Sequence, residues 1–89
     1  MIGRKVYEVW LERTAERNLG RLSNKEFQRV VSRIKALARN PRPPGCRKIS
    51  GSANDWRIRI GDFRVIYEID DKSKSIRVFF IKHRKEAYR

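Results

Sequence analysis

Three arginines stand among alternating isoleucines and aromatic residues in one stretch, Asp55 to Asp70, with the sequence DWRIRIGDFRVIYEID. Arginine stays charged throughout the physiological pH range, and its planar guanidinium can hold a phosphate through two hydrogen bonds. Arg57, Arg59 and Arg64 therefore suit the binding of a polyanion, provided that the fold brings them together. If it does not, the same residues would be ordinary solvated side chains on the wet face of a sheet.

The spacing of these residues predicts a β-hairpin with strands over 56–60 and 63–69. Gly61-Asp62 is a two-residue turn of a kind that hairpins favour. In this register Arg59 lies directly opposite Arg64, and all three arginines share the face that does not carry the isoleucines. Like charges directly opposite each other destabilise a sheet. An anion bound between Arg59 and Arg64 would remove that penalty.

The C-terminal segment carries further residues of the same chemistry. A third strand is expected over 76–81, beside 63–69, and it would bring the tail to the end of the arginine face. Basic groups interleaved with aromatic rings are typical of sites for single-stranded nucleic acid. The candidate RNA-binding residues are Phe79, as a ring on which a base could stack, with Lys82, Lys85 and, before the hairpin, Arg47 and Lys48.

Composition supports a polyanionic partner and a single domain, 1–89. The chain has 23 Lys and Arg against 10 Asp and Glu, which gives a net charge of +13. A field of this size attracts nucleic acid or an acidic protein. Cys46 is the single cysteine, so no internal disulfide can form. Because no apolar run has the length of a signal peptide or a membrane span, we expect a cytoplasmic protein that does not contact membranes.

The remaining elements must support this sheet. Residues 5–11 alternate as a strand does, and a short helix is expected around Ala15 and Leu19. Ser23 and Glu26 form a capping box that begins a second helix with an apolar stripe, which ends before Pro41. A proline-rich link then leads into the sheet. The predicted fold is α+β: an N-terminal strand, an antiparallel helical hairpin and a three-stranded antiparallel meander, in one mainly antiparallel sheet with the helices on one face.

Three segments, in this order and at this spacing, carry a family resemblance: NPRPPG, WRIRIGDFRVIYEI and HRKEAY. With the elements around them they resemble the RelE/ParE toxin superfamily, and its RelE-like mRNA interferase branch in particular. The resemblance covers essentially the whole chain. It implies the toxin of a type II toxin–antitoxin system, which cleaves mRNA in the ribosomal A site and so inhibits translation.

The resemblance also implies a set of catalytic residues. Arg64 matches the family's central strand arginine, and Arg84 and Tyr88 match the arginine and tyrosine near the C-terminus. Arg57 and Arg59 fall where many relatives have lysines. The implied reaction is attack by an RNA 2′-hydroxyl on the neighbouring phosphorus, without a metal or other cofactor. Because arginine is a poor base, Tyr88 is the first candidate for the general base, and His83 is the second.

Partners and alternatives follow from the same resemblance. The expected partners are an acidic, RelB-like antitoxin, the ribosome with its mRNA, and operator DNA only through the antitoxin complex. One alternative is a ParE-like inhibitor of gyrase, which has the same fold and cleaves no RNA. Another is a nucleic-acid-binding protein without catalysis, for which the positive charge alone would suffice.

Overall fold

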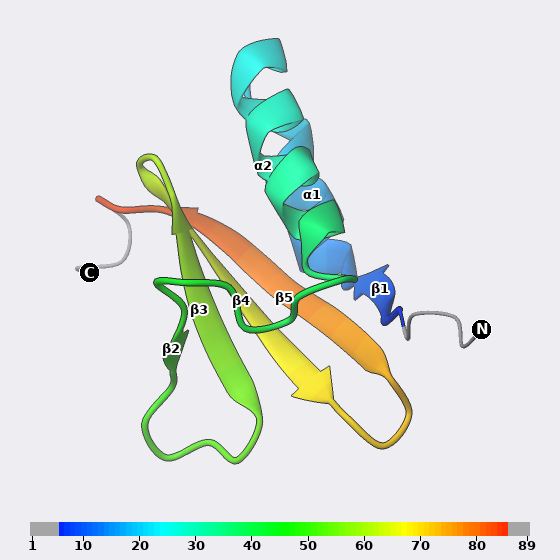
Figure 1. Ribbon diagram of the computed structural model, residues 1–89. Coiled ribbons are helices and arrows are strands. Elements are labelled where there is room, and N and C mark those ends of the chain that lie inside the picture. The colour runs from blue at the N-terminus through cyan, green and yellow to red at the C-terminus, as the bar shows by residue number, and fades with distance from the viewer. Residues whose placement is uncertain (1–5, 86–89) are drawn as a thin grey trace.

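The computed structural model describes residues 6–85, which form two helices and one five-stranded sheet (Figure 1). No helix in this part of the chain is long and apolar enough to cross a membrane. The helices are α1 (Arg13–Gly20) and α2 (Asn24–Ala36), and the strands are β1 (Glu8–Leu11), β2 (Arg47–Lys48), β3 (Asp55–Ile60), β4 (Phe63–Asp70) and β5 (Ser75–His83).

The strands follow the order β1-β5-β4-β3-β2 across the sheet. β1 runs parallel to β5, and the other neighbours are antiparallel. The two helices run antiparallel to each other and cross the sheet as a second layer (Figure 1). This arrangement confirms the predicted α+β fold. The sequence did not predict β2, which extends the sheet by one short strand along β3.

The central hairpin has the predicted register. Ile60 pairs with Phe63, and Arg59 pairs with Arg64. Gly61 adopts φ +59, which the first residue of this turn requires and which glycine adopts without steric cost. The two arginines therefore lie directly opposite each other, beside the tip of the hairpin.

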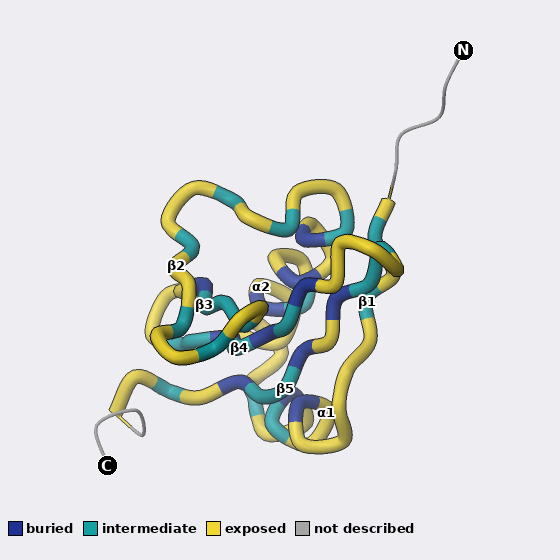
Figure 2. Tube along the Cα trace, turned by 90° about the horizontal axis from the view of Figure 1, so that it is seen from below, coloured by how far each residue is buried: buried dark blue, intermediate teal, exposed yellow. Residues whose placement is uncertain are grey.

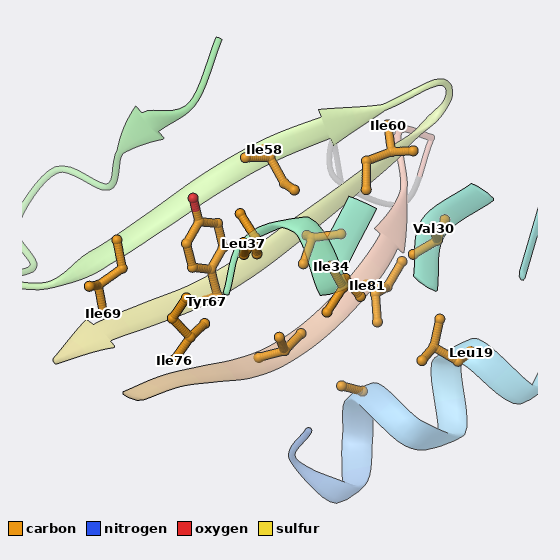
Figure 3. Close-up of a cluster of buried hydrophobic side chains, with 13 residues drawn as sticks. Leu19, Val30, Ile34, Leu37, Ile58, Ile60, Tyr67, Ile69, Ile76 and Ile81 are labelled. Atoms are coloured by element: carbon orange, nitrogen blue, oxygen red, sulfur yellow. The ribbon is translucent and has the colours of Figure 1, made fainter. Parts of the chain in front are cut away.

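The core lies between the helices and one face of the sheet. Figure 3 shows Tyr67 and the isoleucines of the sheet facing Ile34 of α2 and Leu37, the residue that follows this helix. Figure 2 shows buried positions on the strands and the helices, while the connections are mostly exposed or intermediate. Because strand side chains alternate, burying this face leaves Arg57, Arg59 and Arg64 on the other one, here called the outer face.

The helices begin much as the sequence predicts. The Ser23 hydroxyl accepts a hydrogen bond from the backbone N–H of Glu26, and the Glu26 carboxylate accepts one from Ser23, so the capping box is confirmed. Phe27 belongs to the predicted apolar stripe of α2 but is not buried, because 40 % of its surface is exposed. The first turn of α2 projects beyond the sheet (Figure 1), so a side chain there has little to pack against.

β5 differs from the expected strand in length and in regularity. It continues to His83, and its pairing with β4 shifts between Ile66 and Tyr67. Ile66 pairs with Phe80 and Tyr67 pairs with Val78, so Phe79 is an extra residue, as in a β-bulge. Regular alternation along β5 would place Phe79 on the outer face. The extra residue reverses the alternation, so Phe80 lies on the outer face instead.

A polar cluster fixes the proline-rich link against the sheet. Arg42 donates two hydrogen bonds to the Asp71 carboxylate, at 2.9 and 3.4 Å, and the Tyr7 hydroxyl donates a third. The Arg42 guanidinium also lies 5.0 Å from the centre of a Trp56 ring, within the range of a cation–π contact. The cluster joins the link to the β4–β5 turn and to the residues before β1.

Protonation of Asp71 is expected to destabilise the protein only in strong acid. Hydrogen bonds from Arg42 and then Tyr7 lower the pKa of the Asp71 carboxyl from 3.8 to about 2. Because the folded pKa lies below the unfolded one, the stabilisation is complete above about pH 5 and is lost as the pH falls through about 2. Urea unfolding of the protein and of Asp71→Asn should give a difference in unfolding free energy that shrinks over this range. A difference that does not change with pH would contradict this assignment.

Candidate nucleic-acid interface

Three arginines line one cavity of about 200 Å³ at the tip of the central hairpin, here called the arginine hollow. Arg59 and Arg64 come from the paired strands β3 and β4. Arg84 comes from the residues after β5, whose end lies beside the hairpin turn (Figure 1). The backbone N–H of Arg84 donates to the carbonyl oxygen of Asp62 at 2.6 Å, which holds this segment at the turn.

Asp62 also contributes the carboxylate of the arginine hollow. One of its oxygens lies 4.0 Å from Nη1 of Arg84, and the two side chains are 64 % and 66 % exposed. Exposed ion pairs contribute only about 0–1 kcal/mol. A phosphate, which carries more charge and can be held by two hydrogen bonds from a guanidinium, would compete well with this carboxylate for Arg84.

A second hollow, of about 250 Å³, adjoins the first on the outer face and is here called the Phe80 hollow. Arg64 lines both cavities. Apolar side chains from β4, from β5 and from the residue that follows β2 form much of this second cavity, and cationic side chains surround them. Its lining residues are Ile49, Arg57, Arg64, Ile66, Phe80 and Lys82.

The two hollows together can hold an anion beside a flat apolar group. Three guanidinium groups around one cavity can stabilise negative charge that develops on phosphate oxygens, because they are already in place before the reaction. The half-buried residues Ile66 and Phe80 offer apolar surface next to them. Such a combination matches a nucleotide unit of single-stranded nucleic acid.

Most of the residues expected at the site do lie on this face. Arg57, Arg59, Arg64, Arg84 and Lys82 line the two hollows. Arg47 pairs with Arg57 across β2 and β3, and paired residues of an antiparallel ladder share a face. Arg47 thus extends the basic surface along the outer face.

Three expected residues are not part of this arrangement. Lys48 pairs with Trp56, whose side chain packs against the core, so the register assigns Lys48 to the helix side of the sheet. Phe79 is displaced by the bulge, and Phe80 replaces it in the hollow. Lys85 follows the strand as an exposed residue and lines neither hollow.

His83 also lies on the helix side. It pairs with Phe63, and the two rings meet edge to face with centres 5.3 Å apart. Nδ1 of His83 accepts a hydrogen bond from the backbone N–H of Lys85 at 3.2 Å. The imidazole therefore lies on the side away from the Phe80 hollow. Tyr88, the other expected base, lies outside the described residues.

Two further residues at the site could not be predicted from the sequence. Asp62 was assigned only to the turn. From α2, Arg29 places its guanidinium against the turn, since a Cβ built on Gly61 would lie 2.9 Å from Nη1 of Arg29. Contacts between elements that are distant in sequence leave no pattern from which they could be predicted.

Comparisons with known proteins agree with this fold. The toxin of the archaeal RelE–RelB complex from Pyrococcus horikoshii matches with a TM-score of 0.80 and 27% identity, over 89% of this chain and 96% of that one. The toxin–antitoxin complex RelBE2 from Mycobacterium tuberculosis gives a TM-score of 0.80 and 26% identity, over 92% and 95%. The isolated E. coli RelE toxin, at 17% identity over 92% and 90%, shares the fold with a TM-score of 0.76. No curated protein matches the chain in sequence.

The fold is that of a toxin of the RelE/ParE superfamily. A family model described as the ParE toxin of the type II toxin–antitoxin system parDE matches residues 9–88. The chain belongs to this family of type II toxins.

Proposed function

We propose that this toxin is an endoribonuclease that cleaves mRNA in the ribosomal A site and thereby inhibits translation in the cytoplasm. The observation that carries the proposal is the arginine hollow, in which Arg59, Arg64 and Arg84 surround one cavity of about 200 Å³. RNA cleavage by an internal 2′-hydroxyl needs cations around the scissile phosphate. A toxin that only bound another protein would have no need of a cavity with this lining.

In the proposed reaction, the 2′-oxygen attacks the adjacent phosphorus and the bond to the 5′-oxygen of the next nucleotide breaks. The products are a 2′,3′-cyclic phosphate and a new 5′-hydroxyl, whose oxygen takes up a proton from water as it leaves. Arg64 and Arg84 bind the phosphate oxygens as negative charge develops on them. Arg57 and Arg59 hold the RNA so that the attacking and leaving oxygens are in line with phosphorus.

The proton of the 2′-hydroxyl requires a base, for which we propose Tyr88. Its position in the HRKEAY motif supports this choice by resemblance. His83 remains the second candidate, and its ring contacts Phe63, which also lines the arginine hollow. In this scheme the arginines that surround the phosphate supply the stabilisation that a metal ion provides in other nucleases.

Inhibition of gyrase is the second candidate, and the family model favours it. The model that matches residues 9–88 describes ParE toxins, while the similar solved structures include RelE toxins. A gyrase inhibitor would use the same fold to bind a protein, without any requirement for Tyr88. The two activities are separable by assay, because one needs RNA and the other needs DNA supercoiling.

An antitoxin is the expected partner, as in the RelE–RelB structures that this chain resembles. We propose that the antitoxin is acidic and RelB-like, because this chain carries a net charge of +13. Its binding would prevent contact with the ribosome and mRNA. Binding to operator DNA would occur only through the toxin–antitoxin complex.

The test is cleavage of a defined mRNA by the purified protein, with and without programmed ribosomes. The nuclease proposal expects cuts that depend on the ribosome and leave 2′,3′-cyclic phosphate ends. Tyr88→Phe should remove these cuts while leaving the thermal unfolding midpoint unchanged. Intact mRNA in every reaction, together with inhibition of gyrase supercoiling, would replace the nuclease by the second candidate.

A further inference from the structure

We infer that the Phe80 hollow is a nucleobase site, in which one base stacks on Phe80 while its phosphate lies in the arginine hollow. The inference deepens the proposed function and rests on RNA as the ligand of the outer face. It does not require that the RNA be cleaved. The two cavities share Arg64 as a common wall, so a ligand that fills both must carry an anionic group next to a flat apolar one.

The apolar part of the hollow is separate from the protein core. Ile49, Ile66 and Phe80 are half-buried, yet none belongs to the core cluster or to the residues that pack against it. Ile66 and Phe80 are cross-strand partners, and the backbone N–H of Ile49 bonds to the carbonyl of Asp55 beside them. Burial of the core leaves these residues on the opposite face, and an apolar patch exposed there is typical of a binding site.

The bulge in β5 is the local feature that produces this arrangement. Without the bulge, with Phe79 paired opposite Ile66, regular alternation would direct Phe80 and Lys82 to the helix side. With the bulge, Phe80 and Lys82 lie on the outer face opposite Ile66 and Arg64. Bulges often redirect a side chain toward a functional site.

The charges around the ring suit a nucleotide. Nζ of Lys82 lies 5.0 Å from the centre of the Phe80 ring, so the ring already attracts a cation to one face. A base that stacks on this face would displace the ammonium group of Lys82, which would then lie nearer the phosphates of the RNA backbone. Arg57 and Arg64 stand on the opposite β3–β4 side of the same cavity. Because every base has a π face, stacking of this kind tolerates different sequences.

The size of the cavity fits a single base better than a larger ligand. Its volume of about 250 Å³ lies below the range of about 300–1,000 Å³ that is typical of sites for drug-sized molecules. A larger ring system would have to extend into the arginine hollow, where its surface would displace the phosphate.

The test uses a trinucleotide whose 2′-positions are all O-methylated, so that binding is measured without cleavage. NMR titration of the full-length protein gives the affinity. Nuclear Overhauser contacts between Phe80 ring protons and base protons report stacking. Phe80→Ala should raise the dissociation constant of the trinucleotide about 5- to 100-fold, which is the loss expected when one base no longer stacks on an aromatic ring. Phe80→Trp should retain the affinity and the base contacts.

Phe79→Ala is the matched control, because it removes the same side chain from the neighbouring position outside the hollow. It should bind like the unmodified protein. Phe80→Leu keeps most of the apolar volume but has no aromatic face, so it separates stacking from folding if the alanine variant unfolds. Unchanged binding by Phe80→Leu, or equal losses at positions 79 and 80, would overturn the nucleobase site. Absence of mRNA cleavage with intact Phe80-dependent binding would overturn the nuclease alone.

Discussion

Replacement of Arg64 by alanine is expected to slow ribosome-dependent mRNA cleavage by about 10²–10³-fold, the cost of removing one group that stabilises transition-state charge. Arg64 is the residue common to both hollows, and it lies opposite Arg59 on the neighbouring strand. Its loss removes the guanidinium that we propose to bind the phosphate, and it removes the side chain that lines both cavities. Single-turnover rates on ribosomes programmed with one defined mRNA provide the measurement, since they exclude effects on product release.

Arg77→Ala is the matched control for this experiment. Arg77 pairs with Glu68, so it lies on the same outer face and its removal changes the net charge equally. It contacts Glu12 at 3.7 Å and lines a separate cavity, away from the arginine hollow. Its loss should leave the cleavage rate within a few fold. A similar loss of rate in both variants would show that total charge, and not the site, drives the reaction.

Arg64→Lys distinguishes charge from geometry. Lysine keeps the positive charge but donates as a point charge, without the planar fork that binds two phosphate oxygens. We expect a rate between those of the alanine variant and the unmodified protein. A lysine variant as slow as the alanine variant would mean that the bidentate geometry of Arg64 carries its whole contribution.

The central hairpin could be predicted from the sequence because its determinants are local. The Gly61-Asp62 turn sets the register, and the register sets which residues face each other. The pairing of Arg59 with Arg64 follows directly and is confirmed. The capping box at Ser23 is local in the same sense, since both of its hydrogen bonds join residues three positions apart.

The part of the site that β5 forms could not be predicted from local sequence patterns. A bulge changes the face of every residue beyond it, and the run VFFI around Phe79 and Phe80 has no alternation from which the extra residue could be located. The sequence therefore indicated that aromatic and basic groups would reach the site. It could not indicate that Phe80 replaces Phe79, or that His83 lies on the helix side.

The two faces of the sheet have different roles. One face is buried under the helices and stabilises the fold. The other face holds like charges next to one another, which destabilises the sheet. That cost is tolerable because the hairpin is held from behind by core residues such as Ile58 and Val65, which are 2 % and 0 % exposed. The buried core thus holds a strongly basic outer face in place and compensates for this cost.

Replacement of Tyr67 by alanine is expected to cost about 3–5 kcal/mol in unfolding free energy, the usual loss for a large buried ring. Tyr67 is 0 % exposed beneath the helices, and its hydroxyl donates to the Pro41 carbonyl at 2.7 Å. Tyr67→Phe retains the ring and loses only this hydrogen bond, so it should cost about 0.5–1.5 kcal/mol. Since small domains have about 5–15 kcal/mol in all, urea unfolding should separate the two variants clearly. Equal losses in the two variants would mean that the hydrogen bond to Pro41 accounts for the whole contribution of Tyr67 to the stability of the sheet that carries the arginines. The packing of the ring would then contribute nothing.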